Sequence, residues 1–313
     1  MIEKRLGQGE TPAEKALEEA IARVPGWEGR AALYAPLVGG LMNGNFRVAL
    51  DGDARRYFIK VPGAGSEKFI DRKAAHAAAE NAFRMGIGPE VVFFDPETGI
   101  EAFEFLEGYR ACTNADFRDE QIQTEVIEIY KAFNSGPPLP LTKTVFDMID
   151  EHFEQARELG SHLPSDFAWL ERRYEETKAA MLASGLDLVP CFNDPMPGNF
   201  LQKPGAAMKL VDCEFTSNNE RAYELGVFIG EMFYPEDRSL ELIEQYYGNA
   251  KSATVARVNV ARMLADIKWA SWAIVNRKLS DWDFDYQKYG AWKYMRARSL
   301  LFDPRWEAWL RKL

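Results

Sequence analysis

One short stretch, residues 191–214, concentrates polar residues whose types and spacing suit phosphoryl transfer. Asp194 and Asn199 lie five positions apart in a loop rich in proline and glycine, a composition that cannot continue a helix. Residues 200–211 then follow the pattern of a strand, a turn and a second strand, which should return Asp212 close to Asn199. Carboxylate and amide oxygens are the ligands that Mg²⁺ prefers.

These residue types match a known division of labour. In phosphoryl transfer one aspartate accepts the proton of the substrate hydroxyl, while an asparagine and a second aspartate hold magnesium on the phosphates. We therefore expect Asp194 to be the catalytic acceptor and Asn199 and Asp212 to be metal ligands, with Glu214 adding a contact through water. The alternative is a purely structural turn, because aspartate, asparagine, proline and glycine are common turn residues.

Two features upstream would suit a nucleotide site. Gly39 and Gly40, followed by Asn43 and Asn45, join two predicted strands, and glycines there let backbone amides approach phosphates. The turn is not a P-loop, because no Gly-Lys-Ser/Thr follows it. Lys60 ends the next strand, where it would bind phosphate oxygens if the sheet covers a nucleotide. A plain hairpin with a solvated lysine is the alternative.

A lysine in that position needs an acidic partner, which we expect on the helix predicted at 70–85. Glu80 is the preferred candidate, and Glu67 and Asp71 are the alternatives. Together with the glycine turn and Lys60, Glu80 completes the predicted ATP-binding set.

The elements that must position these residues divide the chain in two. The first ~105 residues alternate helices and strands, which predicts a small antiparallel sheet with a packed helix. Its helices are predicted at 12–24 and 70–85, and its strands at 34–38, 46–50, 57–61, 91–94 and 101–105. From about residue 116 the chain is mostly helical, with candidates at 119–134, 144–159, 166–184, 220–233, 239–247, 255–279 and 285–300. We place the boundary between 1–107 and 108–313, with Gly108 as the hinge.

Composition sets outer limits on function. The 313 residues carry a formal charge of −10, which argues against nucleic-acid binding and suits a cationic or neutral small substrate. The three cysteines show no CxxC spacing, as expected for a reducing cytoplasm. No stretch approaches the 18 apolar residues of a membrane span, and no apolar segment follows Met1, so we expect a cytoplasmic protein without membrane insertion.

The signature around the catalytic loop resembles that of the choline/ethanolamine kinases, a branch of the aminoglycoside-phosphotransferase-like kinases. The family has His-Asn-Asp-x₄-Asn followed by a hydrophobic residue, where this chain has residues 192–200. The family's Ile-Asp-Phe-Glu-Tyr and Asn-x-Arg-x-Phe-Asp correspond here to residues 211–215 and 219–224, with a later acid at Glu231. The chain departs from the pattern at Phe192, in place of the histidine, and at Glu224, in place of the aspartate.

The resemblance implies a fold and an activity. The fold would be a bilobal protein-kinase-like α+β fold, with an N-terminal antiparallel sheet lobe that covers ATP and a larger helical C-terminal lobe. The activity would be ATP- and Mg²⁺-dependent phosphorylation of a small amino alcohol, with choline first and ethanolamine second. A homodimer is also compatible with the resemblance.

Aromatic residues gather after residue 269, where the resemblance implies the substrate site. A quaternary ammonium has no N–H group, so aromatic faces and a carboxylate bind it instead of hydrogen bonds. The family pattern nominates the substrate-binding residues Trp269, Trp272, Phe284, Tyr289 and Glu231. Plain core packing is the alternative, and we expect it for Trp292, Trp306 and Trp309.

Two rival functions stay open. The first is another small-molecule kinase of the same superfamily, acting on an aminoglycoside or a sugar-like alcohol, although polyamines favour several carboxylates over aromatic faces. The second is a non-catalytic nucleotide- or amine-binding relative, since Phe192 replaces the family's histidine. Turnover of ATP would separate the second rival from a kinase.

Overall fold

The computed structural model describes residues 3–37, 43–63, 70–280 and 283–313. The chain forms two compact units, each built from two segments. Unit 1 comprises Met1–Cys112 and Gly198–Phe215, and unit 2 comprises Thr113–Pro197 and Thr216–Leu313. This division differs from the predicted one, because the hairpin after Asn199 belongs to the sheet-rich unit. The α+β organisation itself is as the sequence predicts.

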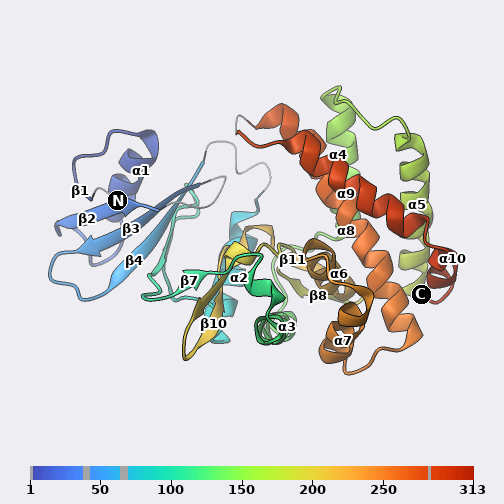
Figure 1. The fold of residues 1–313 in the computed structure, drawn as a ribbon. Helices are drawn as coiled ribbons and strands as arrows, with labels where there is room; N and C mark the ends of the chain where they lie inside the picture. Colours follow the sequence, from blue (N-terminus) through green and yellow to red (C-terminus); the bar gives the residue numbers. More distant parts are fainter. Residues whose placement is uncertain (1–2, 38–42, 64–69, 281–282) are drawn as a thin grey trace. The chain divides into compact units, whose positions relative to one another are not determined.

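Unit 1 contains a six-stranded antiparallel sheet of order β1-β2-β3-β4-β6-β5 (Figure 1). Its strands are β1 (Lys4–Arg5), β2 (Ala32–Pro36), β3 (Asn43–Leu50), β4 (Arg56–Pro62), β5 (Val91–Phe94) and β6 (Glu101–Glu104). The sequence predicts five of the six within a few residues. It misses β1, which is only two residues long and has no hydrophobic pattern of its own.

Helix α1 (Pro12–Ile21) packs its apolar side on this sheet. Thr11 and Glu14 form a capping box that starts the helix, as their spacing allows. Leu17 and Ile21 are buried with Val48 and Ile59 of the sheet in one hydrophobic cluster. The core of unit 1 therefore joins elements that are close in sequence.

A second, three-stranded sheet in unit 1 brings in the later segment. Its order is β10-β9-β7, with β7 (Arg110–Ala111), β9 (Phe200–Lys203) and β10 (Ala206–Leu210). The hairpin β9–β10 is followed by a short 3-10 helix, Cys213–Phe215, which packs against α2 (Arg72–Arg84). The pairing of β7 with β9 explains why the boundary of the first segment falls after Cys112 and not at the predicted residue 107.

Unit 2 is mainly helical. Its helices are α3 (Glu120–Asn134), α4 (Val145–Glu158), α5 (Phe167–Ser184), α6 (Arg221–Glu231), α7 (Glu236–Tyr247), α8 (Ser252–Leu279), α9 (Tyr286–Leu301) and α10 (Trp306–Leu310). Helix α8 runs 28 residues and contacts α4, α6, α9 and α10, so it is buried on most sides (Figure 1). Two short strands, β8 (Leu188–Cys191) and β11 (Ser217–Glu220), pair antiparallel, one directly before and one directly after residues 192–216.

The predicted helices of unit 2 agree with the observed ones within about three residues, and α10 is the one that the sequence misses. Trp306 and Trp309 of α10 are buried, as expected for core residues. The same expectation is wrong for Trp292, which is 53% exposed because it lies on the outer side of α9. Periodicity alone could not separate these positions, since the aromatic residues of this region occur on several sides of their helices.

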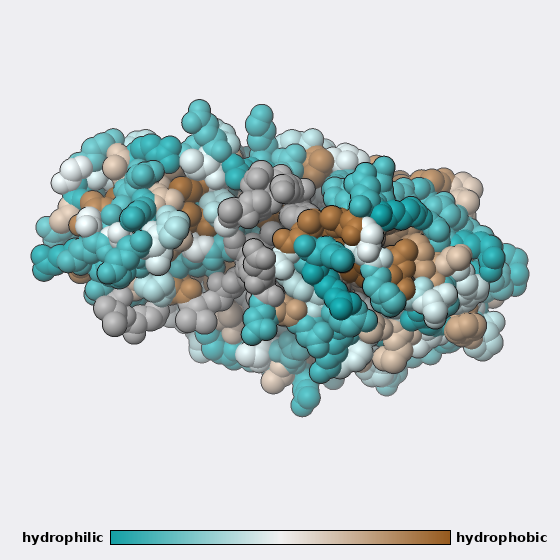
Figure 2. All heavy atoms as spheres, turned by 90° about the horizontal axis from the view of Figure 1, so that it is seen from above, coloured by the Kyte–Doolittle hydropathy of each residue, from teal (hydrophilic) through white to brown (hydrophobic). Residues whose placement is uncertain are grey.

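One face of the molecule is largely polar. Figure 2 shows hydrophilic residues over most of one face, with smaller hydrophobic areas between them. No helix of the described residues is long and apolar enough to cross a membrane.

Two glycines of α6 test how closely this helix packs on α8. A Cβ at Gly226 would lie 2.9 Å from the backbone nitrogen of Arg262, whereas a Cβ at Gly230 would meet only the end of the Arg296 side chain, at 3.7 Å. We expect Gly226→Ala to lower the free energy of unfolding by about 1–3 kcal/mol through overpacking. Gly230→Ala is the matched control and should leave stability equal or raise it by up to about 1 kcal/mol through helix propensity. Urea denaturation measures both, and equal stability of the two variants would contradict the close packing.

Candidate active site

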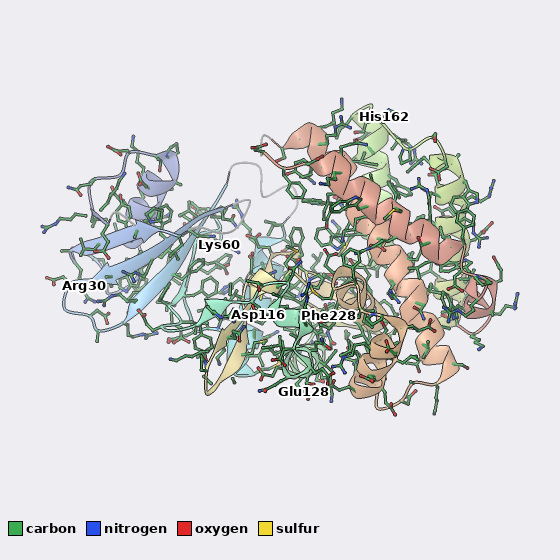
Figure 3. The ribbon with its side chains drawn as sticks, viewed as in Figure 1. Arg30, Lys60, Asp116, Glu128, His162 and Phe228 are labelled. Atoms are coloured by element: carbon green, nitrogen blue, oxygen red, sulfur yellow. The ribbon has the colours of Figure 1, made fainter. Side chains whose placement is uncertain are left out.

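A charged cluster of unit 1 surrounds Lys60 on β4, the residue labelled in Figure 3. Its Nζ lies 2.6 Å from Oδ1 of Asp212 and 2.8 Å from Oε1 of Glu214, and the residue is only 7% exposed. Burial alone would lower the pKa of Lys60. The carboxylates of Asp212, Glu214 and Glu101 raise it by more than burial lowers it, so the pKa lies above its ordinary value. Lys60 is therefore a fixed ammonium and not a solvated strand lysine.

The acidic partner of Lys60 is not the one the sequence favours. Among the described residues, the Glu80 carboxylate instead pairs with Arg84 at 2.8 Å and lies 3.8 Å from His76. Asp71, the second candidate, accepts a hydrogen bond from the backbone of Ala74 and caps α2. Glu67 lies outside the described residues. The prediction of Glu80 fails because the search was limited to one helix, whereas the acids come from the distant hairpin and from β6.

Glu101 is a charged neighbour that the sequence analysis overlooks. It stands directly opposite Lys60 in the β4–β6 register and is 7% exposed. A buried acid in the strand next to a lysine-bearing strand is the signal that could have revealed it, because cross-strand neighbours interact. A small cavity in unit 1 is lined by three of these charged residues, Lys60, Glu101 and Glu214. Its apolar lining includes Ile70, Ala75 and Phe94.

The β9–β10 hairpin returns the chain to its starting point, as the sequence predicts. Leu210 pairs with Phe200, and the backbone N–H of Val211 donates to the carbonyl oxygen of Asn199 at 2.9 Å. Asp212 follows immediately and has a φ of +68°, a left-handed conformation that is unfavourable for a residue with a Cβ. The strain directs its carboxylate to Lys60 and is typical of functional positions.

The donors here fit a divalent cation. Burial and the neighbouring Asp212 raise the pKa of Glu214, which shows that the two carboxylates repel each other even beside Lys60. A divalent cation would relieve that repulsion. No group of three His, Cys, Asp or Glu side chains among the described residues could hold a metal alone. A Mg²⁺ ion does not need one, because it keeps waters and uses substrate phosphates beside one or two carboxylates.

Only part of the predicted glycine turn lies within the described residues. Gly39 and Gly40 lie outside the described residues. Asn43 and Asn45 belong to β3, and Asn45 stands opposite Lys60 in the β3–β4 register. Asn43 donates from Nδ2 to Oε1 of Glu214 at 2.8 Å, so it joins the charged cluster.

In unit 2, Asp194 lies in the loop that follows β8 and is 8% exposed. Its neighbour Asn193 has a φ of +66° and is tied down on three sides. Asn193 donates from Nδ2 to Ser217 Oγ at 2.9 Å, accepts at Oδ1 from Asn219 Nδ2 at 3.0 Å, and donates its backbone N–H to Glu224 at 3.0 Å. The fixed backbone of Asn193 determines the direction from which Asp194 leaves the loop.

The two residues that depart from the family signature, Phe192 and Glu224, both help to fix the loop before Asp194. Phe192 is fully buried and packs edge-on against Phe133, so it makes no side-chain hydrogen bond. Glu224 is also fully buried, and its carboxylate accepts the backbone N–H groups of Phe192 and Asn193. The Glu224 side chain thus fixes the loop by binding the loop's backbone N–H groups.

The four predicted aromatic residues do lie together in unit 2. The Trp269 and Trp272 rings are 5.5 Å apart, Trp272 and Tyr289 6.1 Å, and Phe284 and Tyr289 5.6 Å, all measured between centroids. Tyr286, which the sequence analysis did not select, contacts both Trp272 and Phe284. The cluster is a real feature, and its role in substrate binding stays a prediction.

Two buried lysines enter this cluster, and neither is anticipated by the sequence analysis. Lys268 Nζ lies 3.1 Å from the Trp269 ring centroid, and Lys293 Nζ lies 4.9 Å from that of Tyr289. Lys293 also forms an ion pair with Glu231, the predicted substrate carboxylate. The available signal was Lys268 itself, a charged residue within the almost continuously buried middle of α8.

Comparison with known proteins shows the class and the family. The fold is protein-kinase-like, and a solved choline/ethanolamine kinase family protein from Mesorhizobium loti superposes with a TM-score of 0.80, at 26% identity over 95% of this chain and 98% of that chain. The choline/ethanolamine kinase family model matches residues 34–254. The chain therefore belongs to the choline/ethanolamine kinase family, whose members are phosphotransferases with an alcohol group as acceptor.

Two further proteins are similar over most of their length. Probable choline kinase 2 of Arabidopsis thaliana is 22% identical over 93% of each chain. A structure of LicA in complex with AMP has a TM-score of 0.72, at 20% identity over 93% of this chain and 99% of that chain. At these identities the structural likeness shows the fold alone.

Glu224 should make stability depend on pH. Burial raises its pKa from the ordinary 4.5 to about 7, against the opposing effect of the hydrogen bonds from Phe192 and Asn193. Between these two values the folded protein holds a proton that the unfolded chain releases, so the free energy of unfolding falls as pH rises. Relative to Glu224→Gln, the wild-type value should fall by about 3 kcal/mol between pH 4.5 and pH 8.

Denaturant titrations at a series of pH values measure this difference. Glu128→Gln, at an exposed position on α3, is the control and should follow the wild-type pH profile. A constant difference between wild type and Glu224→Gln across the range would show that folding does not raise the pKa of this carboxyl.

Proposed function

We propose that this protein transfers the γ-phosphoryl group of ATP, with Mg²⁺, to the hydroxyl of a small molecule. The observation that carries the proposal is the buried Lys60 ammonium held between Asp212 and Glu214. Such a cluster offers one cation for phosphate oxygens and two carboxylates for a metal ion, which is the arrangement phosphoryl transfer needs. The similarity to LicA in complex with AMP supports the nucleotide.

The roles of the residues follow from their chemistry. The substrate hydroxyl oxygen attacks the γ-phosphorus, its proton passes to the Asp194 carboxylate, and the bond from the γ-phosphorus to the bridging oxygen breaks to release ADP. Lys60 would bind phosphate oxygens. Asn199 and Asp212 would hold magnesium, and Glu214 would contact it directly or through water. Magnesium, when bound, would neutralise the phosphate charge.

The substitution of Phe192 does not argue for a non-catalytic relative. The task of a bracing side chain is to fix the loop that carries the catalytic aspartate. Here Glu224 accepts two backbone N–H groups of the loop, and Asn193 is bound by both Ser217 and Asn219. This network supports a working kinase.

The acceptor is the least determined part of the proposal. Choline or ethanolamine, the acceptor expected from the sequence, is supported by family membership and by the aromatic cluster of Trp269, Trp272 and Tyr289. The ion pair of Glu231 with Lys293 is an observation against it, because that carboxylate was expected to face the substrate ammonium.

The location of the protein, its lack of nucleic-acid binding and its dimerisation stay predictions. A cytoplasmic location is supported by Cys112, Cys191 and Cys213, none of which forms a disulfide. The charge of −10 supports a protein that does not bind nucleic acid. A homodimer remains compatible with family membership.

Asp194→Ala should lower kcat by about 10²–10⁴-fold, the usual contribution of a positioned acid or base. The KM for ATP should change little, since the variant removes the proton acceptor and leaves Lys60 and Asp212 in place. A coupled assay of ADP release over a panel of small alcohols gives both constants, and thermal denaturation checks folding. Wild-type protein that releases no ADP with any acceptor would refute the kinase.

Asp212→Asn should raise the Mg²⁺ concentration needed for half-maximal activity by at least about tenfold, because a neutral amide is a weaker ligand than a carboxylate. Asp51→Asn, in the exposed turn after β3, is the matched control in the same unit. The measurement is a magnesium titration at saturating ATP and acceptor. An unchanged midpoint in Asp212→Asn would leave Asp212 with a structural role only.

A further inference from the structure

A large cavity in unit 2 has no part in the proposed reaction. Its volume is about 900 Å³, within the roughly 300–1,000 Å³ that is typical of small-molecule sites. The described residues that form it come from three places in the chain: residues 160–166, which join α4 to α5, the end of α8, and α9. His162, labelled in Figure 3, belongs to the first of these segments.

Helix α9 contributes one of its sides to the cavity. Four of its lining residues follow one another at intervals of four, which places them along the same side of a helix: Tyr286, Gly290, Tyr294 and Arg298. Among the described residues, none of the five predicted substrate-binding residues lines the cavity. The cavity is thus separate from the aromatic cluster, although Tyr286 also contacts Trp272 of that cluster, at 5.6 Å between ring centroids.

Two buried hydroxyl groups of the lining have no hydrogen-bond partner among the described residues. They are Oγ of Ser161 and Oη of Tyr294, and Tyr294 is only 2% exposed. Burying a hydroxyl without a partner costs free energy, so native proteins rarely do it. Because both residues border the same cavity, a polar group bound there would lie close to both.

The charged side chains of the lining favour an anion. Asp166 is the one carboxylate among the described lining residues, and Arg298 already pairs with it, with 2.6 Å between Nε and Oδ2. Arg277 and Lys278 remain, both exposed at the end of α8. Arg277 donates from Nη1 to Gln287, which leaves further N–H groups of its guanidinium for a ligand. In a chain with a net charge of −10, this local excess of positive charge attracts anions.

The remaining walls of the cavity are largely apolar. Leu163 and Pro164 come from the connection between α4 and α5, Ala273 and Ile274 come from α8, and the ring of Tyr286 comes from α9. Small-molecule sites combine such walls with a few polar groups that fix the orientation of the ligand. A ligand with a charged head and an apolar body therefore matches this lining better than a bare inorganic ion does.

We propose that this cavity is a second ligand site, separate from the site of phosphoryl transfer, and that it takes a small organic anion: a phosphate monoester or a carboxylate on an apolar body. Arg277 and Lys278 bind the anionic head, and the apolar body lies against Leu163 and Ile274. The anion is not the acceptor of the kinase, because the cavity contains none of the residues assigned to the reaction.

A purely structural role for the two cations is the alternative. Arginine and lysine in the last turn of a helix interact favourably with the helix macrodipole, whether or not a ligand is bound. Under this alternative, substitution of Arg277 and Lys278 changes stability and leaves the binding of every ligand unchanged. Binding measurements therefore separate the two roles.

The first experiment compares ligands by isothermal titration calorimetry on the full chain. The anions are octyl phosphate and octanoate, and the comparators are 1-octanol, which lacks the charge, and inorganic phosphate, which lacks the apolar body. We expect the better of the two anions to bind at least about tenfold more tightly than either comparator. That anion also identifies the preferred head group. Equal or weaker binding of both anions overturns the proposal.

The second experiment removes the charge of the site. The double variant Arg277→Gln/Lys278→Gln should weaken binding of the better anion by about 10–100-fold and leave binding of 1-octanol unchanged. The matched control is Lys251→Gln/Lys288→Gln, which removes the same charge at exposed positions outside the cavity lining and should bind like wild type. Thermal denaturation checks that both double variants fold. Unchanged anion affinity in Arg277→Gln/Lys278→Gln overturns the proposal.

The third experiment fills the cavity and leaves its charges in place. Ala291 is an exposed lining residue on α9, so Ala291→Trp should keep the fold and lower anion affinity at least about tenfold. Ser299→Trp, at an exposed position on the same helix outside the lining, is the control. Retained affinity in Ala291→Trp would mean that the anion binds elsewhere and overturns the proposal. None of these measurements needs turnover of ATP, so their outcome is independent of the proposed function.

Discussion

The ion pairs of Lys60 with Asp212 and Glu214 are the interaction on which unit 1 depends. They join β4 to the end of a hairpin 152 residues later in the chain. Lys60 and Glu214 are largely buried, so removing either side chain would leave the charge of the other without its partner. The pairing fixes where the hairpin must lie against the sheet, and with it the position of Asn199 next to Asp212. The left-handed backbone at Asp212 costs free energy, and the ion pair with Lys60 helps to offset that cost.

A comparable constraint acts in unit 2, through backbone groups instead of side chains. Glu224 at the start of α6 binds the N–H groups of Phe192 and Asn193, so the loop before Asp194 is attached to a helix and not only to its neighbouring strands. This explains how a chain can replace a histidine by phenylalanine at that position and keep an ordered loop. The Phe192 ring packs against Phe133, and the hydrogen bonds to the loop backbone come from Glu224.

The sequence was sufficient to predict most helices and strands and the return of Asp212 to Asn199, and the errors have physical causes. Helices and strands follow from hydrophobic period and from turn residues, which are local signals, and the return of Asp212 to Asn199 follows from one hairpin. The partners of Lys60 do not follow from local signals. Glu101 comes close to Lys60 through the sheet register, and Asp212 and Glu214 come close to it through the long-range hairpin. The buried Lys268 was missed for another reason. A resemblance directs attention to the residues that match a family pattern, and Lys268 lies between them.

The two-segment construction of each unit has a consequence for synthesis. At about 5–20 residues per second, the ribosome needs roughly 8–30 seconds to make the 152 residues from Lys60 to Asp212. During that interval the six-stranded sheet can form from its own segment, but its central lysine must stay hydrated until the hairpin emerges. Unit 1 therefore closes late, after more than half of the chain has left the ribosome, and newly made sheet is exposed to chaperones and proteases for most of that time.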